Sequence, residues 1–549
     1  RQYQNRPDRD FSKYRLYQRR FFSEKSQGGQ VLNTDDDNNV TDGLLKFDPG
    51  WNTYYSGVVT SSDEVAMQKN MSVMMVPSNS ALTEYFTNQE GKVLLEEYGS
   101  LDKVPNDVIV RLINNNMLST FSESVPSKFS GILNDANDPM GVERAAIDSV
   151  WMGCNGAVYL TNRVYSPTSY VSVLFPAVVK NNLKVMRWAV KENQYEVYLN
   201  SLNSRYSFFI PGNGALQWYI DPVSYGKSSR ELCRFYYDEE RKTVRAWTRA
   251  INTDGSLAED STEIEDYNLI KKRLQDILDN HIVIGDVENG NEYYRTKGGQ
   301  EIRVKNASMG ASGMTVEGSR QINEGAPINV SFVYDQTKAG NGKTYVLKDP
   351  IMTTEKNVMD LLAEVPEMST FMNLLSGSGL LESSRDNKQC VKNTNISLFN
   401  TYHYTVYVPT NTSLADFPTW ADVEAEPEGS PKRAADSTRI MNMLLLHIQD
   451  GSLFIGSGNV AEDGYETSLV DPETQKFVRI YAELKDDNLY VRKTQSSASV
   501  KRMVLKDDEK KKYNRMAREY VTNSNDKETA TGLYTTSTAV VHLIDGPIE

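Results

Sequence analysis

Cysteine is scarce in this chain of 549 residues, which contains only three: Cys154, Cys233 and Cys390. An odd and widely spaced set provides neither a disulfide framework nor the paired spacing of a zinc site. We expect free thiols at all three positions, and free cysteine is among the most often buried residue types. This cysteine usage does not indicate a particular cellular compartment.

Long apolar runs and an excess of positive charge are also missing. No apolar stretch approaches the ~18–20 residues that a membrane-spanning helix needs. The net charge is −13, and the densest basic run, at residues 510–512, directly follows three acidic residues at 507–509. Because phosphate neutralisation supplies most of the affinity for duplex nucleic acids, we do not expect a nucleic-acid partner.

Motifs that carry catalysis or bind nucleotides are absent or incomplete. Neither a GxSxG elbow nor an HExxH helix occurs. Residues 340–344, GNGKT, resemble the end of a phosphate-binding loop, but Thr337 stands where that loop needs glycine. The following residues predict a strand, whereas the loop needs a helix. We therefore predict no catalytic residue, no cofactor and no enzymatic activity.

A possible calcium loop is incomplete in the same way. Asp35, Asp37 and Asn39 have the spacing of its first ligands. Val40 then replaces the glycine that makes the turn, and Lys46 replaces the bidentate glutamate. No metal site is predicted.

One short pattern occurs three times, at residues 72–82 (SVMMVPSNSAL), 206–216 (YSFFIPGNGAL) and 404–417 (YTVYVPTNTSLADF). Each copy has an aliphatic residue, proline, a small residue, asparagine, a variable residue, a small residue and leucine. Proline cannot donate to a β-ladder, and small polar residues cap helices. The pattern therefore predicts a strand that stops at proline and a helix that follows it. A pattern repeated in this way indicates tandem domains.

The segments around the three copies follow a similar order. Helices are predicted before the second and third copies, at residues 178–199 and 358–381. A later helix ends near Asn116, His281 or His447. Insertions with predicted strands lie before that later helix in the second copy, at residues 233–250, and after it in the third, at residues 477–484 and 489–493. Closing strands are predicted at residues 155–165, 342–350 and 537–547.

These blocks together resemble the fasciclin-like adhesion domain family. Residues 408–411 (VPTN) resemble the first block of that family, residues 445–448 (LLHI) the second, and residues 540–546 (VVHLIDG) the closing strand. The resemblance implies an α+β fold with three tandem fasciclin-like domains, each a small β-sandwich or wedge with packed helices. The corresponding boundaries are 1–169, 170–352 and 353–549. In its insertions and its abundant tyrosine, the chain is similar to multi-repeat surface proteins of Bacteroidota.

The resemblance implies a non-enzymatic adhesion or interaction protein at the cell surface, with a protein or a glycan as partner. The alternative is glycan capture beside a carbohydrate uptake system, with Trp218, Trp247 and Trp420 as sugar platforms. We expect an exported, outer-membrane lipoprotein whose anchor preceded Arg1 and was removed. Because Asn280 and Leu446 precede the two histidines, the tyrosine–histidine pair linked to integrin adhesion is missing.

The repeated polar residues admit two interpretations. His281 and His447 could act as bases or metal ligands, but each stands alone at an apolar helix end. We predict that they are structural and hydrogen-bonded. Asn79, Asn213 and Asn411 are predicted to cap or brace turns. The function is then expected in the insertions, because variable loops on a rigid scaffold usually carry binding.

Overall fold

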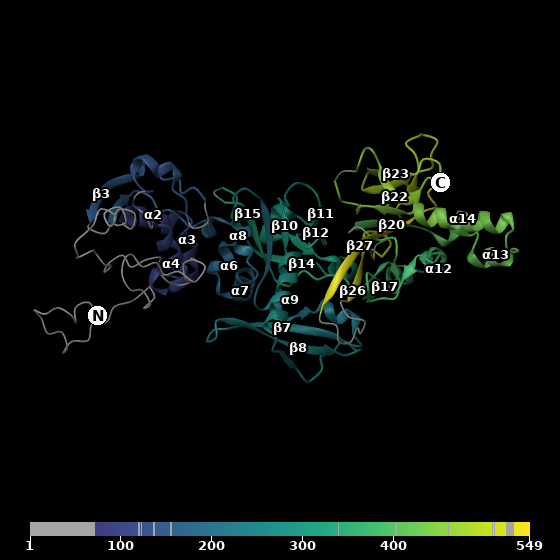
Figure 1. The fold of residues 1–549 in the computed structure, drawn as a ribbon, viewed down its shortest axis with the longest axis horizontal. Coiled ribbons are helices and arrows are strands. Elements are labelled where there is room, and N and C mark those ends of the chain that lie inside the picture. The colour runs from purple at the N-terminus through teal and green to yellow at the C-terminus, as the bar shows by residue number, and fades with distance from the viewer. Residues whose placement is uncertain are drawn as a thin grey trace, which may run out of the picture. The chain divides into compact units, whose positions relative to one another are not determined.

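Two compact units make up the computed structural model, residues 1–179 and 180–549 (Figure 1). The structure describes residues 45, 72–118, 121, 123–134, 138–153, 156–338, 340–400, 403–458, 460–507, 509, 511–522 and 532–549. The calcium-like residues 35–46 lie outside the described residues, except Leu45.

The same four-strand arrangement occurs three times. In each case a motif strand lies in the middle and pairs in parallel with the strand that closes its repeat. An antiparallel strand flanks each of these two. The motif strands are β1 (Ser72–Pro77), β5 (Tyr206–Pro211) and β20 (His403–Pro409), and the closing strands are β4 (Gly156–Thr161), β15 (Gly342–Leu347) and β27 (Leu533–Ile544). The full orders are β2-β1-β4-β3, β10-β5-β15-β14 and β21-β20-β27-β26.

In the first unit these four strands form the whole sheet. The outer strands are β2 (Met117–Leu118) and β3 (Ile147–Gly153). Five helices accompany them: α2 (Asn79–Asn88), α3 (Lys92–Tyr98), α4 (Asn106–Asn115), α5 (Thr168–Val171) and α6 (Phe175–Val179). Tyr170, Phe175 and Val178 are buried in one cluster with residues of α2, α3 and α4. Residues 170–179 thus pack with the first unit, beyond the predicted boundary at 169/170.

The second unit contains two larger sheets, each an extension of the shared arrangement. The first has the order β10 (Ile282–Ile284), β5, β15, β14 (Ile328–Gln336), β13 (Thr315–Glu317), β12 (Glu301–Lys305), β11 (Tyr293–Arg295). The second has the order β17 (Ser384–Arg385), β18 (Lys388–Cys390), β26 (Arg515–Thr522), β27, β20, β21 (Ile448–Asp450), β22 (Tyr465–Val470), β23 (Phe477–Lys485), β24 (Asn488–Arg492), β25 (Arg502–Met503). The first sheet is extended beyond β14 only, whereas the second is extended on both sides, by β17 and β18 beyond β26 and by β22–β25 beyond β21.

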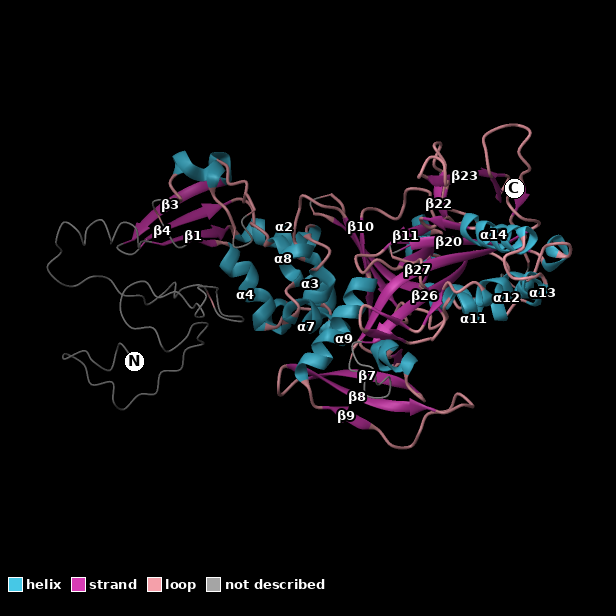
Figure 2. Ribbon diagram, turned by 45° about the vertical axis from the view of Figure 1, so that its right-hand side comes forward, coloured by secondary structure: helices cyan, strands magenta, loops and turns pink. Residues whose placement is uncertain are grey.

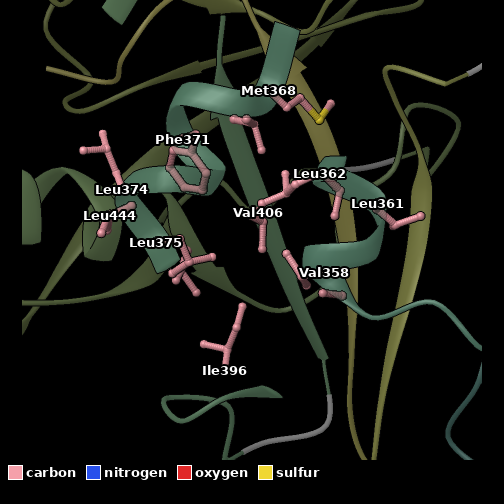
Figure 3. Packing of buried hydrophobic residues seen from close by; sticks show 14 of the residues in the cluster. Val358, Leu361, Leu362, Met368, Phe371, Leu374, Leu375, Ile396, Val406 and Leu444 are labelled. Atoms are coloured by element: carbon pink, nitrogen blue, oxygen red, sulfur yellow. The ribbon is translucent and has the colours of Figure 1, made fainter. Parts of the chain in front are cut away.

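Helices of the second unit cover the faces of these sheets. They are α7 (Lys184–Glu192), α8 (Tyr195–Leu199), α9 (Tyr267–Asn280), α10 (Ser319–Glu324), α11 (Val358–Ala363), α12 (Ser369–Gly377), α13 (Trp420–Ala425) and α14 (Pro431–Leu446). In the apolar cluster around α11 and α12, Val406 of β20 packs with Leu362 of α11 and Phe371 of α12 (Figure 3). All three side chains are fully or almost fully buried. Burying such side chains contributes roughly 1.5–3 kcal/mol each before the entropy cost of ordering them.

The two sheets of the second unit also contact each other. The ring of Tyr293 stacks on that of Phe454, with centroids 3.9 Å apart and planes 7° apart. Asn323 accepts from the Met516 N–H at 3.0 Å and donates to its carbonyl at 2.7 Å. Residues 180–549 are thus held together by both apolar packing and a reciprocal pair of hydrogen bonds.

The mixed α and β content confirms the predicted fold class at that level, while the division into three domains stays a prediction. The predicted helices and insertion strands occur close to their expected positions. One expectation is wrong for two copies: the pattern begins a helix only at α2. After β5 and β20 the chain makes single turns at residues 215–217 and 411–414. Gly212 and Gly214 raise the helix cost in one copy, and Pro418 stops the turn in the other.

Glycine is required where the closing strands begin. Gly156 has φ +158° and Gly342 has φ +150°, which side chains rarely adopt. A Cβ at Gly342 would lie 1.9 Å from the Tyr206 carbonyl oxygen, and one at Gly156 would lie 2.0 Å from that of Ser72. The register places both at the same position relative to the motif strand.

We predict that Gly342→Ala lowers the free energy of unfolding by about 3 kcal/mol or more, because the strand must move away from Tyr206. Gly214→Ala is the matched control, since nothing lies within 4 Å of a Cβ there, and it should change stability by less than about 0.5 kcal/mol. Urea unfolding of the full chain, followed by circular dichroism, measures both. Equal stability of the two variants would contradict the close approach.

Candidate functional site: the outer face of an inserted sheet

The insertion of the second repeat forms a separate four-stranded antiparallel sheet. Its strands are β6 (Tyr219–Ile220), β7 (Arg230–Asp238), β8 (Thr243–Ile251) and β9 (Thr262–Ile264). The predicted hairpin is confirmed, and Lys242 with φ +54° makes its turn. Figure 2 shows this sheet beside α9. We call the side that faces away from the buried side chains the outer face.

The inner face is apolar and fixes the sheet to its unit. Cys233, Phe235, Val244 and Ala246 alternate with polar residues and are fully or almost fully buried. Because successive side chains in a strand point to opposite faces, this alternation assigns the two sides. Cys233 and Cys390 are free and buried, as predicted, whereas Cys154 lies outside the described residues.

A buried ion pair anchors the start of the insertion. Arg273 Nε of α9 donates to Asp221 Oδ2 at 2.9 Å, and both side chains are under one-tenth exposed. Removing one member of such a pair is strongly destabilising, since it leaves a buried charge. Burial also raises the pKa of the neighbouring Asp276 to about 6. Deletion of residues 221–267 would therefore damage the fold, and point substitutions on the outer face are the cleaner test.

The outer face carries aromatic and arginine side chains in cross-strand rows. Arg234 lies opposite Trp247, which in turn lies opposite Glu263, while Tyr236 lies opposite Arg245. Residues directly opposite in an antiparallel sheet share a face, so one row runs Arg234, Trp247, Glu263. Trp218 directly precedes β6, whose Tyr219 pairs with Cys233, and Arg234 reaches the side chain of the adjacent Gln217. Trp218 therefore lies next to the Arg234 end of the row, and we count it with the row.

These side chains contact one another closely. The Arg245 guanidinium lies 4.8 Å from the Trp247 ring centroid, and that of Arg234 lies 5.5 Å from the Tyr236 centroid. The Tyr236 and Trp247 rings meet edge to face at 5.3 Å. Each exposed cation–π contact contributes about 0.5–1 kcal/mol and holds the rings in place.

The arginines of the face differ in their partners. Arg245 Nη2 lies 2.6 Å from Glu263 Oε1, so that charge is neutralised. Arg234 donates only to the side-chain oxygen of Gln217, at 3.4 Å, and no carboxylate of the described residues is within ion-pair distance of it. Arg249 donates to the Glu259 carbonyl, and its Nε has no protein partner among the described residues. Arg234 and Arg249 are therefore cations of this face without a carboxylate partner among the described residues.

The three tryptophans that were predicted as sugar platforms lie in different environments. Trp218 is 61% exposed directly before β6, and Trp247 is half-buried on the outer face. Trp420 instead donates to the Leu374 carbonyl at 2.7 Å and packs against the core, so it is unsuited to ligand contact. Trp151, 54% exposed on β3, was missed because its strand is an edge strand only in the folded sheet.

His281 and His447 are structural, as predicted. Each is fully buried, and its Nδ1 bonds to the carbonyl four residues earlier, at 2.6 and 2.7 Å. Each Nε2 accepts from the backbone N–H of Ile351 or Ile548, at 2.9 and 3.0 Å. Both ring nitrogens of each histidine are therefore hydrogen-bonded within the protein. Burial lowers the pKa of both histidines to about 4, so the rings are neutral near pH 7.

Asn116 takes the same role in the first unit. Its Nδ2 donates to the Leu112 carbonyl, four residues earlier, at 2.9 Å, and to the Tyr165 carbonyl at 2.8 Å. Tyr165, Ile351 and Ile548 all lie four residues after the end of the paired closing strand. The side chain at the helix end therefore fastens the chain that leaves the closing strand.

The motif asparagines brace a helix other than the expected one. Asn213 Oδ1 accepts from the Val185 N–H of α7, and Asn411 Oδ1 accepts from the Thr370 N–H of α12. Both donors belong to the first turn of a preceding helix, where N–H groups lack intrahelical partners. Ser78 and Thr410 cap the turns after the motif strands. Asn79 is thus not the cap of α2.

Other binding chemistry has little support within the described part of the chain. It contains no group of three or more His, Cys, Asp or Glu residues that could hold a metal ion. No described helix is both long and apolar enough to cross a membrane. In the GNGKT segment, Lys343 pairs with Glu288 at 2.7 Å and the segment continues as β15, a strand as predicted.

We predict that stability responds to pH through these histidines. Burial lowers the pKa of His447 from its ordinary 6.5 to about 4, so the unfolded chain binds a proton more readily. Stability from His447 is complete above pH 6.5 and is lost as pH falls toward 4. His447→Asn, which copies Asn116, should remove about 2 kcal/mol of the loss between pH 7 and pH 5. Urea unfolding of the wild type and the variant at pH 7 and pH 5 measures the free energy of unfolding. An equal loss in both proteins between the two pH values would contradict the prediction.

Two buried carboxyls lower stability as pH rises, which is opposite to the effect of the histidines. The pH dependence of the variant must therefore be compared with that of the wild type. Burial raises the pKa of Glu301 to about 7 and that of Glu519 to about 8. Both groups bind protons more readily when folded, and they cost stability as pH rises above about 4.5. Their contribution is common to the wild type and His447→Asn and cancels in the difference.

No family model matches the chain, and no curated protein matches it. Among solved structures, a similarity is found to a FAS1 domain pair from the insect cell adhesion molecule fasciclin I. The match has 13% identity and a TM-score of 0.22, and covers 67% of this chain and 97% of the other. That TM-score is too low to establish a common fold.

Proposed function

We propose that this chain is a non-enzymatic interaction protein with three tandem fasciclin-like domains, exported to the cell surface for adhesion to a protein or glycan. The repeated motif residues are occupied in bracing strands and helices. The insertion sheet is outside the four-strand arrangement that recurs, and its outer face presents Trp218 and Arg234 to solvent. Binding usually resides in such additions to a rigid scaffold. This exposed face is the observation that carries the proposal.

A second candidate function is glycan capture beside a carbohydrate uptake system. The exposed ring of Trp218 favours it, because aromatic rings present apolar surface that a sugar ring can cover. The two functions differ in where the partner resides. Adhesion requires a partner fixed on another surface, whereas capture requires a soluble glycan.

Adhesion is tested with beads that carry the full chain on a cell monolayer. The double variant Trp218→Ala, Arg234→Gln should lower bead retention by roughly fivefold or more, because exposed tryptophan and arginine are frequent energetic centres of interfaces. Trp151→Ala is the matched control, since it removes an exposed tryptophan from the other unit. Retention equal to wild type in the double variant would exclude the outer face as the adhesive surface.

A further inference from the structure

We propose that the outer face binds a carboxylate-bearing polysaccharide, with sugar rings against Trp218 and Trp247 and a uronate carboxylate on Arg234. This inference rests on the proposed function and names the ligand class for the same face. It uses the row of side chains described above.

The spacing of the row suits an extended chain of rings. Trp247 belongs to β8 and Trp218 directly precedes β6, and these two strands flank β7 at a separation of two inter-strand spacings, about 10 Å. Arg234 belongs to β7, between them. A polysaccharide laid across the strands would present successive rings to the two tryptophans and a substituent to the arginine between them.

Arg234 has the chemistry to bind the acidic group. A guanidinium presents paired N–H donors that match a carboxylate bidentately, and charge-assisted bonds of this kind are about twice as strong as neutral ones. The neighbouring Arg245 is already bound by Glu263. Arg234 makes only the long contact to Gln217, and its guanidinium lies 5.5 Å from the Tyr236 ring centroid. Its remaining donors are therefore positioned for an external anion.

Acidic residues surround the row, so its unpaired positive charge is local to Arg234. Asp238 ends β7 on the outer face, residues 239–240 lie in the turn, and residues 259–260 precede β9. A uronate chain carries one carboxylate on each ring, so a single unit offers an anion for Arg234 and a ring face for a tryptophan. A single-stranded nucleic acid also combines anions with rings, and poly(dT) tests that alternative directly.

The experiment uses the full chain and three immobilised probes, with binding measured by biolayer interferometry. The probes are polygalacturonate, the same polymer with its carboxylates methyl-esterified, and poly(dT). We expect binding to polygalacturonate that weakens between 50 and about 500 mM salt, as exposed charge pairs are screened. The esterified polymer should bind at least tenfold more weakly. Equal binding of the ester, or tighter binding of poly(dT), would overturn the inference.

Four variants assign the binding to the row. Arg234→Gln and Trp218→Ala should each weaken polygalacturonate binding about tenfold, the loss of one charge-assisted pair or one ring contact. Arg241→Gln changes net charge equally but lies in the hairpin turn, and Trp151→Ala removes an exposed ring of the other unit. Both controls should bind as wild type. Equal losses for Arg234→Gln and Arg241→Gln would overturn the inference, because net charge alone would then account for binding.

The ligand class and the proposed function fail separately. Bead retention that depends on Trp218 and Arg234 without polygalacturonate binding would leave the function and overturn the ligand class. Polygalacturonate binding through the row without bead retention would support the ligand class and overturn adhesion. We expect each variant to unfold thermally as the wild type does, since Trp218 is largely exposed and Arg234 makes no ion pair with the described residues.

Discussion

The parallel pairing between each motif strand and its closing strand is the constraint on which the rest of the chain depends. The paired segments are far apart in sequence: Tyr206 lies opposite Gly342, and Tyr404 opposite Ala539. Parallel strands need a long crossover, and the cost of closing a loop grows only slowly with its length. Whole sheets can therefore be inserted between the two strands without undoing their pairing.

The polar residues of the repeats serve this pairing. His281, His447 and Asn116 hold the segment that follows the closing strand, and Asn213 and Asn411 hold the helix before the motif strand. A buried histidine with both ring nitrogens bonded is kept neutral, which removes it from acid–base chemistry near pH 7. The residues that identify the repeats are consequently poor candidates for binding.

The two insertions of the second unit are joined to it in different ways. The strands of the later one add to the shared sheet beyond β21, whereas β6–β9 form a sheet of their own, fixed by Asp221 and Arg273. The separate sheet needs only one face for packing. Its other face is left to solvent with Trp218 and Arg234, which is why it can be altered without loss of the core.

Local pattern in the sequence determined the elements that depend on few neighbours. The strand at residues 206–211, the helix near 269–284 and the hairpin around residue 240 follow from alternation, helical spacing and turn residues, which act within a short window. The structural role of His281 and His447 could also be predicted from the sequence, because each stands alone at an apolar helix end. The mixed α and β class follows from the same signals.

Only the tertiary structure decided which side chains share a face. Trp420 and Trp247 look alike in the sequence, but the first packs against the core at Leu374 and the second lies in a row with Arg234. The motif asparagines bond to helices 28 and 41 residues earlier, a distance that no local pattern reports. Register and long-range packing place these groups, and both are set by contacts between segments that the sequence keeps apart.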